Sequence, residues 1–248
     1  ATIMRRGEVI DEVIPDECGR DALAEKMVGE LPPAVERSTP VRQADRPSRF
    51  AVRSLSVASP DVHGVDLQGV SFEIHAGEIL GIAGVSGNGQ SELMAALSGE
   101  RPFRPRDSGT VHIDGHEITR LSPGDRRDCG LAYVPEQRLG HATVADMTLT
   151  ENALLSASRE EMVRRGIIDW SRTRAFAERC IERFNVVCPG PHAAARQLSG
   201  GNLQKFIVSR ELLRQPTVLI AAQPTWGVDV AAAQQIRSGL VRLARRNG

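Results

Sequence analysis

The spacing of apolar residues divides the chain into regions of different character. Apolar residues alternate with polar ones over 50–57 and 65–74, which predicts antiparallel strands. A strand ending in an Asp-Gly turn is expected at 109–115. Short continuous apolar runs predict buried strands at 79–83, 131–134 and 218–222. Helical spacing predicts helices from about Gln90, over 149–184 with a break near Gly166 and a restart near Asp169, over 198–213 and over 230–246.

This order of elements predicts an α/β fold with a mainly parallel sheet, because strands and helices alternate in the second half of the chain. An antiparallel β region and a helical insertion flank that sheet. The first residues have another character, with two short strands over 1–10 and an amphipathic helix over 16–28. Residues 30–47 carry four prolines among charges and no apolar period, which predicts a linker.

Composition excludes several classes of function. The 248 residues are 41% hydrophobic and carry 31 basic and 31 acidic side chains, so no net charge attracts nucleic acid or an anionic membrane. No apolar run approaches the roughly 20 residues that span a bilayer, and no signal peptide opens the chain. The four cysteines form no C-x-x-C pair and the six histidines show no metal-ligand spacing. These features predict a cytosolic protein.

A glycine-rich turn lies between the predicted strand at 79–83 and the helix that follows it. Glycines let backbone N–H groups converge on an anion, and the helix N-terminus adds partial positive charge. The spacing fits the phosphate-binding loop of nucleoside-triphosphate proteins, except that Gln90 stands where the motif has lysine. The candidate nucleotide-binding residues are Gly84, Gly87, Asn88, Gly89, Gln90, Ser91 and Glu92.

A second candidate anion site opens the helix predicted at 198–213. Its residues are Leu198, Ser199, Gly200, Gly201, Asn202 and Gln204. A serine followed by two glycines offers a hydroxyl and backbone donors at a helix N-terminus, although a plain serine-capped helix start fits the same residues.

Residues 198–205 resemble the LSGGQ signature of ATP-binding-cassette (ABC) ATPases, and most closely the variant found in importers of simple sugars and nucleosides. The resemblance covers about residues 53–248 and implies a RecA-like P-loop core with an antiparallel β subdomain and a helical subdomain. Residues 224–229 resemble the end of the Walker B strand and the D-loop, with Asp229 as its aspartate. The Q-loop glutamine corresponds to Glu136, or to Gln137 after a shift of one residue.

The resemblance also implies a division of the chain. Residues 1–30 resemble the tail of a preceding cassette, residues 31–49 form a linker, and residues 50–248 form a second nucleotide-binding domain. Its helical subdomain covers about residues 136–195. The family's switch histidine has no counterpart before Gly248, so we expect the domain to be incomplete at its C-terminus.

Three departures from the family pattern fall at one nucleotide site. Gln90 replaces the phosphate-loop lysine, Ala222 the Walker B aspartate and Gln223 the catalytic glutamate. Phosphoryl transfer depends on positioning and charge stabilisation, so we expect a site with no intact catalytic residue and little or no hydrolysis. The resemblance implies ATP and Mg²⁺ as ligands, with Ser91 as a candidate Mg²⁺ ligand. It also implies that the intact signature completes the active site of the first cassette in trans.

The family pattern implies three partners: a first cassette in the same polypeptide, integral membrane permease subunits and, indirectly, an extracytoplasmic solute-binding protein. The expected location is the cytoplasmic face of the plasma (inner) membrane. The alternative is a non-transport ABC ATPase, such as a translation-factor-like or regulatory cassette. An unrelated phosphate-loop GTPase or kinase is less favoured because it lacks a segment such as 198–205.

Three further residues have expected roles. We expect Trp170 to lie in a core and Trp226 to pack at the interface between cassettes. Arg138 has two open interpretations, contact with the permease or capping of a solvated turn.

Overall fold

The computed structural model describes residues 1–248 except 6, 16, 20, 21, 24, 27–45, 60, 62, 63, 157–161 and 248. The two strands predicted at the start are confirmed as the antiparallel pair β1 (Thr2–Arg5) and β2 (Glu8–Glu12). Of the helix predicted at 16–28, Ala22, Leu23, Glu25 and Lys26 are helical and the remainder lies largely outside the described residues. Most of the predicted linker also lies outside them, so the division at residues 30 and 49 stays a prediction.

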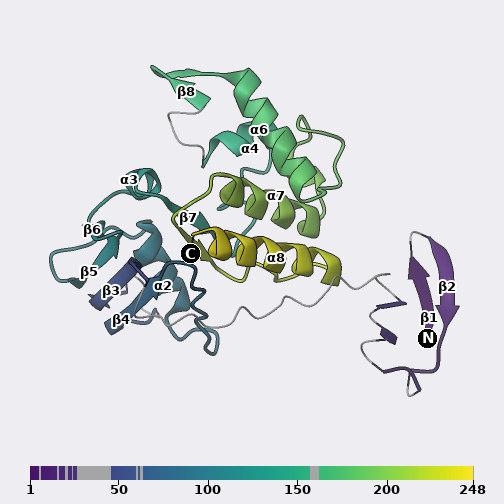
Figure 1. Cartoon of the computed structure of the whole chain (residues 1–248), viewed down its shortest axis with the longest axis horizontal. Helices are drawn as coiled ribbons and strands as arrows, with labels where there is room; N and C mark the ends of the chain where they lie inside the picture. The colour runs from purple at the N-terminus through teal and green to yellow at the C-terminus, as the bar shows by residue number, and fades with distance from the viewer. Residues whose placement is uncertain are drawn as a thin grey trace.

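The predicted antiparallel strands form one four-stranded sheet with the order β4-β3-β5-β6 (Figure 1). Its strands are β3 (Ser48–Val57), β4 (Leu67–His75), β5 (Ser108–Ile113) and β6 (His116–Glu117). The predicted Asp-Gly turn joins the last two strands, and Asp114 and Gly115 have φ of 47° and 80°. Two consecutive positive φ values match the right-handed twist of paired strands, which explains this tight connection.

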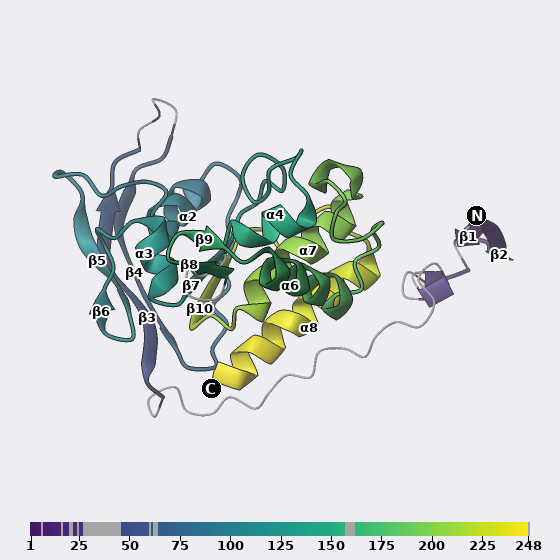
Figure 2. The same ribbon diagram turned by 90° about the horizontal axis from the view of Figure 1, so that it is seen from above.

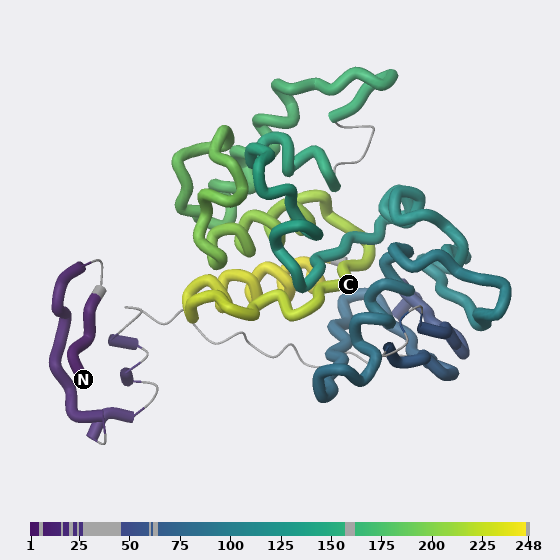
Figure 3. Tube along the Cα trace, turned by 180° about the vertical axis from the view of Figure 1, so that it is seen from behind, coloured from purple at the N-terminus to yellow at the C-terminus, as the bar shows by residue number. Residues whose placement is uncertain are grey.

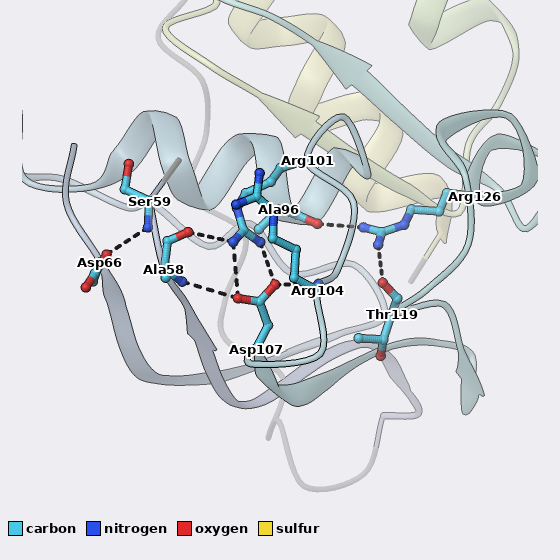
Figure 4. A network of polar contacts seen from close by, with 9 residues as sticks. All are labelled: Ala58, Ser59, Asp66, Ala96, Arg101, Arg104, Asp107, Thr119 and Arg126. Atoms are coloured by element: carbon cyan, nitrogen blue, oxygen red, sulfur yellow. Dashed lines mark hydrogen bonds and ion pairs between the residues drawn. The ribbon is translucent and has the colours of Figure 1, made fainter. Parts of the chain in front are cut away.

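Helix α2 (Gln90–Ser98) packs on this sheet through Leu93, Ala96 and Leu97. The buried Arg126 holds the C-terminal end of the helix, and the buried Arg101 lies just beyond that end (Figure 4). Arg126 of α3 (Pro123–Asp128) donates to the carbonyl oxygens of Ala96 and Leu97, both at 2.7 Å. Arg101 forms two hydrogen bonds with the carboxylate of Asp107, at 2.8 and 3.1 Å. The helix that carries the phosphate loop is therefore fixed at its far end.

Two predicted buried strands are confirmed as the parallel pair β7 (Leu131–Val134) and β10 (Val218–Ala221). Helix α7 (Gly200–Leu213) precedes β10 and α8 (Val230–Asn247) follows it, as the helical spacing predicts. The two helices pack against each other, and the described part of α8 runs beside α7 in each view (Figures 1 and 2). None of the described helices is long and apolar enough to cross a bilayer.

The helical region contains α4 (Leu149–Leu154), the hairpin of β8 (Val163–Arg164) and β9 (Ile167–Ile168), α6 (Trp170–Arg183) and a 3₁₀ helix (Ala195–Gln197). It packs on α7 around a core that includes Leu149, Phe176 and Phe206 (Figure 3). The predicted break at Gly166 is confirmed as the hairpin turn, and Asp169 caps α6. The expectation for Trp170 is wrong: it is the first residue of α6 and is 51% exposed, on the open side of the helix start.

The strand predicted at 79–83 is not formed. These residues have no strand assignment, and Ile79 and Ile82 are 59% and 46% exposed. An apolar run becomes a strand only where a neighbour supplies ladder hydrogen bonds. No described strand pairs with this run, and the parallel sheet consists of β7 and β10 alone. The α/β fold is confirmed, but its parallel sheet is smaller than the sequence predicts.

Candidate functional site

The predicted phosphate loop lies on the surface ahead of α2. Residues 81–88 are exposed, and the helix begins at Gln90 with Gly89 as its N-cap. Gly87 and Gly89 have φ of 87° and 96°, values that side chains with a Cβ rarely adopt. The glycines therefore make the turn that the sequence predicts, and the first N–H groups of α2 open toward solvent.

The Gln90 side chain folds back onto its own loop. Its Nε2 donates to the Val85 carbonyl oxygen at 3.1 Å, and its Oε1 accepts from the Asn88 N–H at 3.2 Å. A Cβ added at Gly84 would lie 2.4 Å from the Gln90 amide nitrogen, so this glycine makes room for the amide. The amide thus shares the Asn88 N–H with the Val85 carbonyl oxygen, which accepts from the same N–H at 3.3 Å.

The next two residues differ in their surroundings. Ser91 is exposed at the start of α2, so its hydroxyl is open to solvent. Glu92 accepts from the Val65 N–H at 3.2 Å through its carboxylate. This contact ties the helix to the segment before β4, and the role of Glu92 in nucleotide binding stays a prediction.

The residues after β7 meet the residues after β10. The Ala222 N–H donates to the Val134 carbonyl oxygen at 2.8 Å, which continues the parallel pairing by one residue. Gln223 has φ of 44°, and its Nε2 donates to Glu136 Oε1 at 2.9 Å. Glu136 makes this contact, and the choice between Glu136 and Gln137 as the Q-loop residue stays a prediction. Neither Ala222 nor Gln223 supplies a carboxylate, so the only acid in this contact comes from Glu136.

The candidate signature forms the start of α7, and Ser199 caps this helix. Ser199 Oγ accepts from the Asn202 N–H at 3.4 Å and from Asn202 Nδ2 at 2.9 Å. Asn202 Oδ1 in turn accepts from the Val187 N–H at 2.9 Å, which connects the cap to the segment after α6. Ser199 and Gly200 are exposed, while Leu203 and Gln204 are buried. The capped helix start therefore leaves Gly200 exposed and Gly201 partly exposed, and it anchors the following turn in the core.

Arg138 joins three of the predicted motifs. Its Nε donates to Oε1 of the buried Gln204 at 3.0 Å, and its Nη2 donates to the Trp226 carbonyl oxygen. Gln204 Nε2 donates to the Pro224 carbonyl oxygen at 3.0 Å. Asp229 Oδ1 accepts from the Ala232 N–H at 2.7 Å at the start of α8. The segment after β7, the start of α7 and the loop after β10 thus form one hydrogen-bonded group.

The structure therefore brings together the predicted Q-loop, signature and D-loop regions. In the described part of the chain, no hydrogen bond or ion pair links residues 84–91 to that group. The sequence did not predict the contacts of Arg138 with Gln204 and Trp226, and its contact with the permease stays a prediction. Sequence reasoning also missed the self-contact of Gln90. Trp226 is 69% exposed, consistent with the interface role expected for it.

Comparison with known proteins agrees with this geometry. The family described as ABC transporter matches residues 67–226. The glucose import ATP-binding protein TsgD13 of Haloferax volcanii is 38% identical over 97% of this chain and 43% of its own length. The guanosine import ATP-binding protein NupO of Bacillus subtilis is 36% identical over 97% of this chain and 46% of its own length. The chain thus spans about half the length of these curated relatives.

Solved structures support the fold. A dimeric ATP-binding cassette bound to ADP and Pi in a post-hydrolysis state has a TM-score of 0.67 at 24% identity, with 80% of this chain and 84% of that chain covered. A nucleotide-free ATP-binding cassette from an ABC transporter has a TM-score of 0.61 at 20% identity, with 81% and 78% covered. Together with the family match, they show that this chain belongs to the ABC transporter family and has the fold of its ATP-binding cassettes.

Proposed function

We propose that this chain is the second cassette of an ABC importer for nucleosides or simple sugars, and that it serves mainly by lending its signature to the first. Three relatives are named as import ATP-binding proteins for glucose, guanosine and nucleosides, and these names support this class of solute. The first cassette would belong to the same polypeptide. Its ATP would lie against Ser199, Gly200 and Gly201 of this chain.

The observation that carries the proposal is the contrast between the two candidate anion sites. The signature helix begins with an exposed Gly200 and a partly exposed Gly201 after an intact serine cap. The phosphate loop has its Asn88 N–H bonded to the Gln90 amide, and positions 222 and 223 lack carboxylates. The chain is therefore better suited to completing another site than to hydrolysing nucleotide in its own.

The chain's own site would hold ATP weakly or without turnover. The remaining backbone donors of 84–89 would face the phosphates, and the exposed Ser91 hydroxyl would be a ligand for Mg²⁺. Gln223 has no basic oxygen that can accept a proton from an attacking water near neutral pH. In the complete importer ATP would be hydrolysed at the site of the first cassette. This chain would contribute its signature to that site from across the interface.

The other partners follow from the proposed class of protein. The helical region that contains α4 and α6 would face integral membrane permease subunits at the cytoplasmic face of the plasma membrane. An extracytoplasmic solute-binding protein would deliver solute to those subunits. The even balance of charge gives no support for a nucleic-acid partner.

The test is a single turnover by the complete importer with a photoreactive ATP labelled on its α-phosphate. After cross-linking, the peptides that retain the label are mapped, and the nucleotide on each is identified as ATP or ADP. We expect unhydrolysed ATP, or little label, on the peptide with residues 84–91, and ADP at the other phosphate loop. ADP forming at both loops at the same rate would contradict the proposal.

A further inference from the structure

We propose that Arg138 is a positioning residue that holds the signature end of α7 against the loop after β10. Its side chain links these two segments to the segment after β7, although it lies 66 residues from Gln204 and 88 from Trp226 along the chain. The inference rests on the proposed function, because the position of the signature matters only where the signature completes a nucleotide site.

The first support is the direction of the hydrogen bonds. The Nε and Nη2 atoms of one planar guanidinium donate to two acceptors, the Gln204 side chain and the Trp226 carbonyl oxygen. A lysine has one nitrogen on a flexible stem and lacks the fixed fork that matches two acceptors at set positions. Among the described residues no carboxylate lies within ion-pair distance of Arg138, so its role depends on this geometry rather than on a paired charge.

The second support is the burial of the acceptor. Gln204 is 2% exposed, and its amide oxygen accepts from Arg138 while its amide nitrogen donates to Pro224. A buried amide that loses one partner costs the full desolvation of that group. The first turn of α7 is therefore joined to the loop after β10 both through the Gln204 amide and through Arg138.

The third support comes from two glycines around the guanidinium. A Cβ added at Gly200 would lie 2.6 Å from Arg138 Nη1, and one added at Gly227 would lie 3.2 Å from Nη2. Gly227 also has φ of 58°, which favours glycine. The guanidinium thus fills the space between the first residue of α7 and the loop after β10, where a side chain at either position would displace it.

The backbone of Arg138 ties the same group to the segment after β7. Its carbonyl oxygen accepts from the Thr143 N–H at 2.9 Å and from Thr143 Oγ1 at 2.6 Å, which fixes the turn that follows. Two residues earlier, Glu136 accepts from Gln223. A shift of residues 136–143 would therefore be passed to the signature through the Arg138 side chain.

The experiment compares Arg138→Lys with the wild type in the complete importer by two measurements. Hydrogen exchange followed by mass spectrometry reports the protection of residues 200–204 and 224–228. Steady-state kinetics report kcat and KM for ATP. We expect exchange in both segments to rise about tenfold and kcat to fall about tenfold or more with KM nearly unchanged, because a misplaced group costs rate without touching nucleotide.

Two further variants make the test specific. Arg49→Lys is the matched control, since Arg49 forms an exposed pair with Asp114 on the antiparallel sheet, and it should leave both measurements unchanged. Gln204→Met removes the acceptor at similar volume, and the double variant with Arg138→Lys should lose little more than either single one.

Unchanged exchange in the two segments would overturn the inference, and so would raised exchange with unchanged kcat in an importer whose ATP turnover does depend on Gly201. Increased exchange across α4, α6 and α7 alike would also overturn it, because it would indicate general loosening rather than positioning. Failure of the proposed function would give a different result, because substitution at Gly201 would then leave ATP turnover intact. In that case the exchange data still show whether Arg138 holds α7, while the effect on kcat disappears.

Discussion

The Gln90 side chain makes both of its hydrogen bonds inside its own loop, with the Val85 carbonyl oxygen and the Asn88 N–H. Replacing a lysine with a glutamine removes a cation, and this contact adds a second effect by placing the amide in the phosphate loop. A phosphate entering the loop would have to break the contact first. The weak binding that we propose for this site would therefore have a local cause that is separate from the missing acids at 222 and 223.

Removing the Gln90 amide should clear it from the phosphate loop and leave the Asn88 N–H with one acceptor, the Val85 carbonyl oxygen at 3.3 Å. We expect Gln90→Ala to tighten Mg·ATP binding by the chain about fivefold, and Gln90→Lys to tighten it further by adding a cation. Titration with a fluorescent ATP analogue measures both constants. Gln68→Ala is the control, because Gln68 is exposed on β4. Weaker binding by Gln90→Ala would show that the amide contacts nucleotide instead of blocking the loop.

The buried carboxylate of Asp107 gives a prediction with a definite pH dependence. Its hydrogen bonds with Arg101 hold the pKa of this carboxyl below its usual value of 3.8, and its side chain is 1% exposed. A carboxyl whose pKa is lower in the folded state stabilises the fold above its unfolded-state pKa. This stabilisation is lost as pH falls through the folded-state pKa. We expect Asp107→Asn to lower the free energy of unfolding by about 3 kcal/mol at pH 7.

The same difference should shrink below pH 3.8, where the carboxyl of the unfolded chain becomes protonated, and should be lost as pH falls through the lower pKa of the folded state. Urea denaturation of both proteins at pH 7, 5 and 3 measures it. Asp146→Asn, at an ion pair with Arg196 whose Asp146 side chain is 85% exposed, should change little at any pH. A pH-independent gap for Asp107→Asn would contradict the assigned cause.

At the scale of elements, hydrogen bonds fix both ends of α2, from the Val65 N–H to Glu92 at its start and from Arg126 at its end. Its N-terminus carries the phosphate loop, and the last carbonyl groups accept from Arg126. Arg126 is 2% exposed and also donates to Thr119 and Leu121, and burial lowers its pKa to about 10. It remains charged at neutral pH, which suits the partial negative charge of a helix C-terminus.

Arg126→Lys should therefore loosen the phosphate-loop helix. A lysine has too few donors for these four carbonyl groups, so buried acceptors are left without partners. We expect a loss of about 3 kcal/mol in the free energy of unfolding, measured by chemical denaturation. Arg172→Lys, at an exposed pair with Asp169, is the control. A loss no greater than that of the control would contradict this role.

The elements also show where sequence patterns suffice. Strands β7 and β10 and helices α6, α7 and α8 follow from apolar spacing and capping residues such as Asp169 and Ser199. The run at 79–83 failed because apolar character cannot tell whether a neighbouring strand is present. The expectation that Trp170 lies in a core was wrong because aromatic character does not show whether anything packs against the first residue of a helix.

The candidate site was predictable in its motifs but not in its contacts. Phosphate-loop glycines and the signature can be recognised by local spacing, because each motif acts through its own backbone. The contacts of Arg138 join residues more than 60 positions apart, and the contact of Gln90 depends on which rotamer the side chain adopts. Neither contact can be predicted from the spacing of residues along the chain. Residues outside the described part leave the division at 30 and 49 a prediction.

At the scale of the whole molecule, two apolar cores meet at the parallel strand pair. One core joins the antiparallel sheet to α2 and includes Leu131 and Ile220, and the other joins α4, α6, α7 and α8 and includes Val134. The phosphate loop belongs to the first part and the signature to the second. In the proposed importer this arrangement lets one chain keep a weak site of its own and complete another with a different surface.

The most direct test of that claim is ATP turnover by the complete importer carrying Gly201→Val or Gln90→Ala. Gly201 is preferable to Gly200, since a Cβ there meets nothing closer than Asp229 Oδ2 at 3.8 Å, whereas a Cβ at Gly200 would strike Arg138. Gly124→Val is the matched control, because Gly124 is also the second residue of a helix and its Cβ would meet only Ser122 Oγ at 3.8 Å.

We expect Gly201→Val to lower kcat by about 100-fold, because its side chain would stand where the nucleotide of the first cassette lies. Gln90→Ala and Gly124→Val should stay within about twofold of the wild type, a change below 0.5 kcal/mol in barrier height. Equal losses from Gly201→Val and Gln90→Ala would contradict the account, because both sites would then take part in turnover.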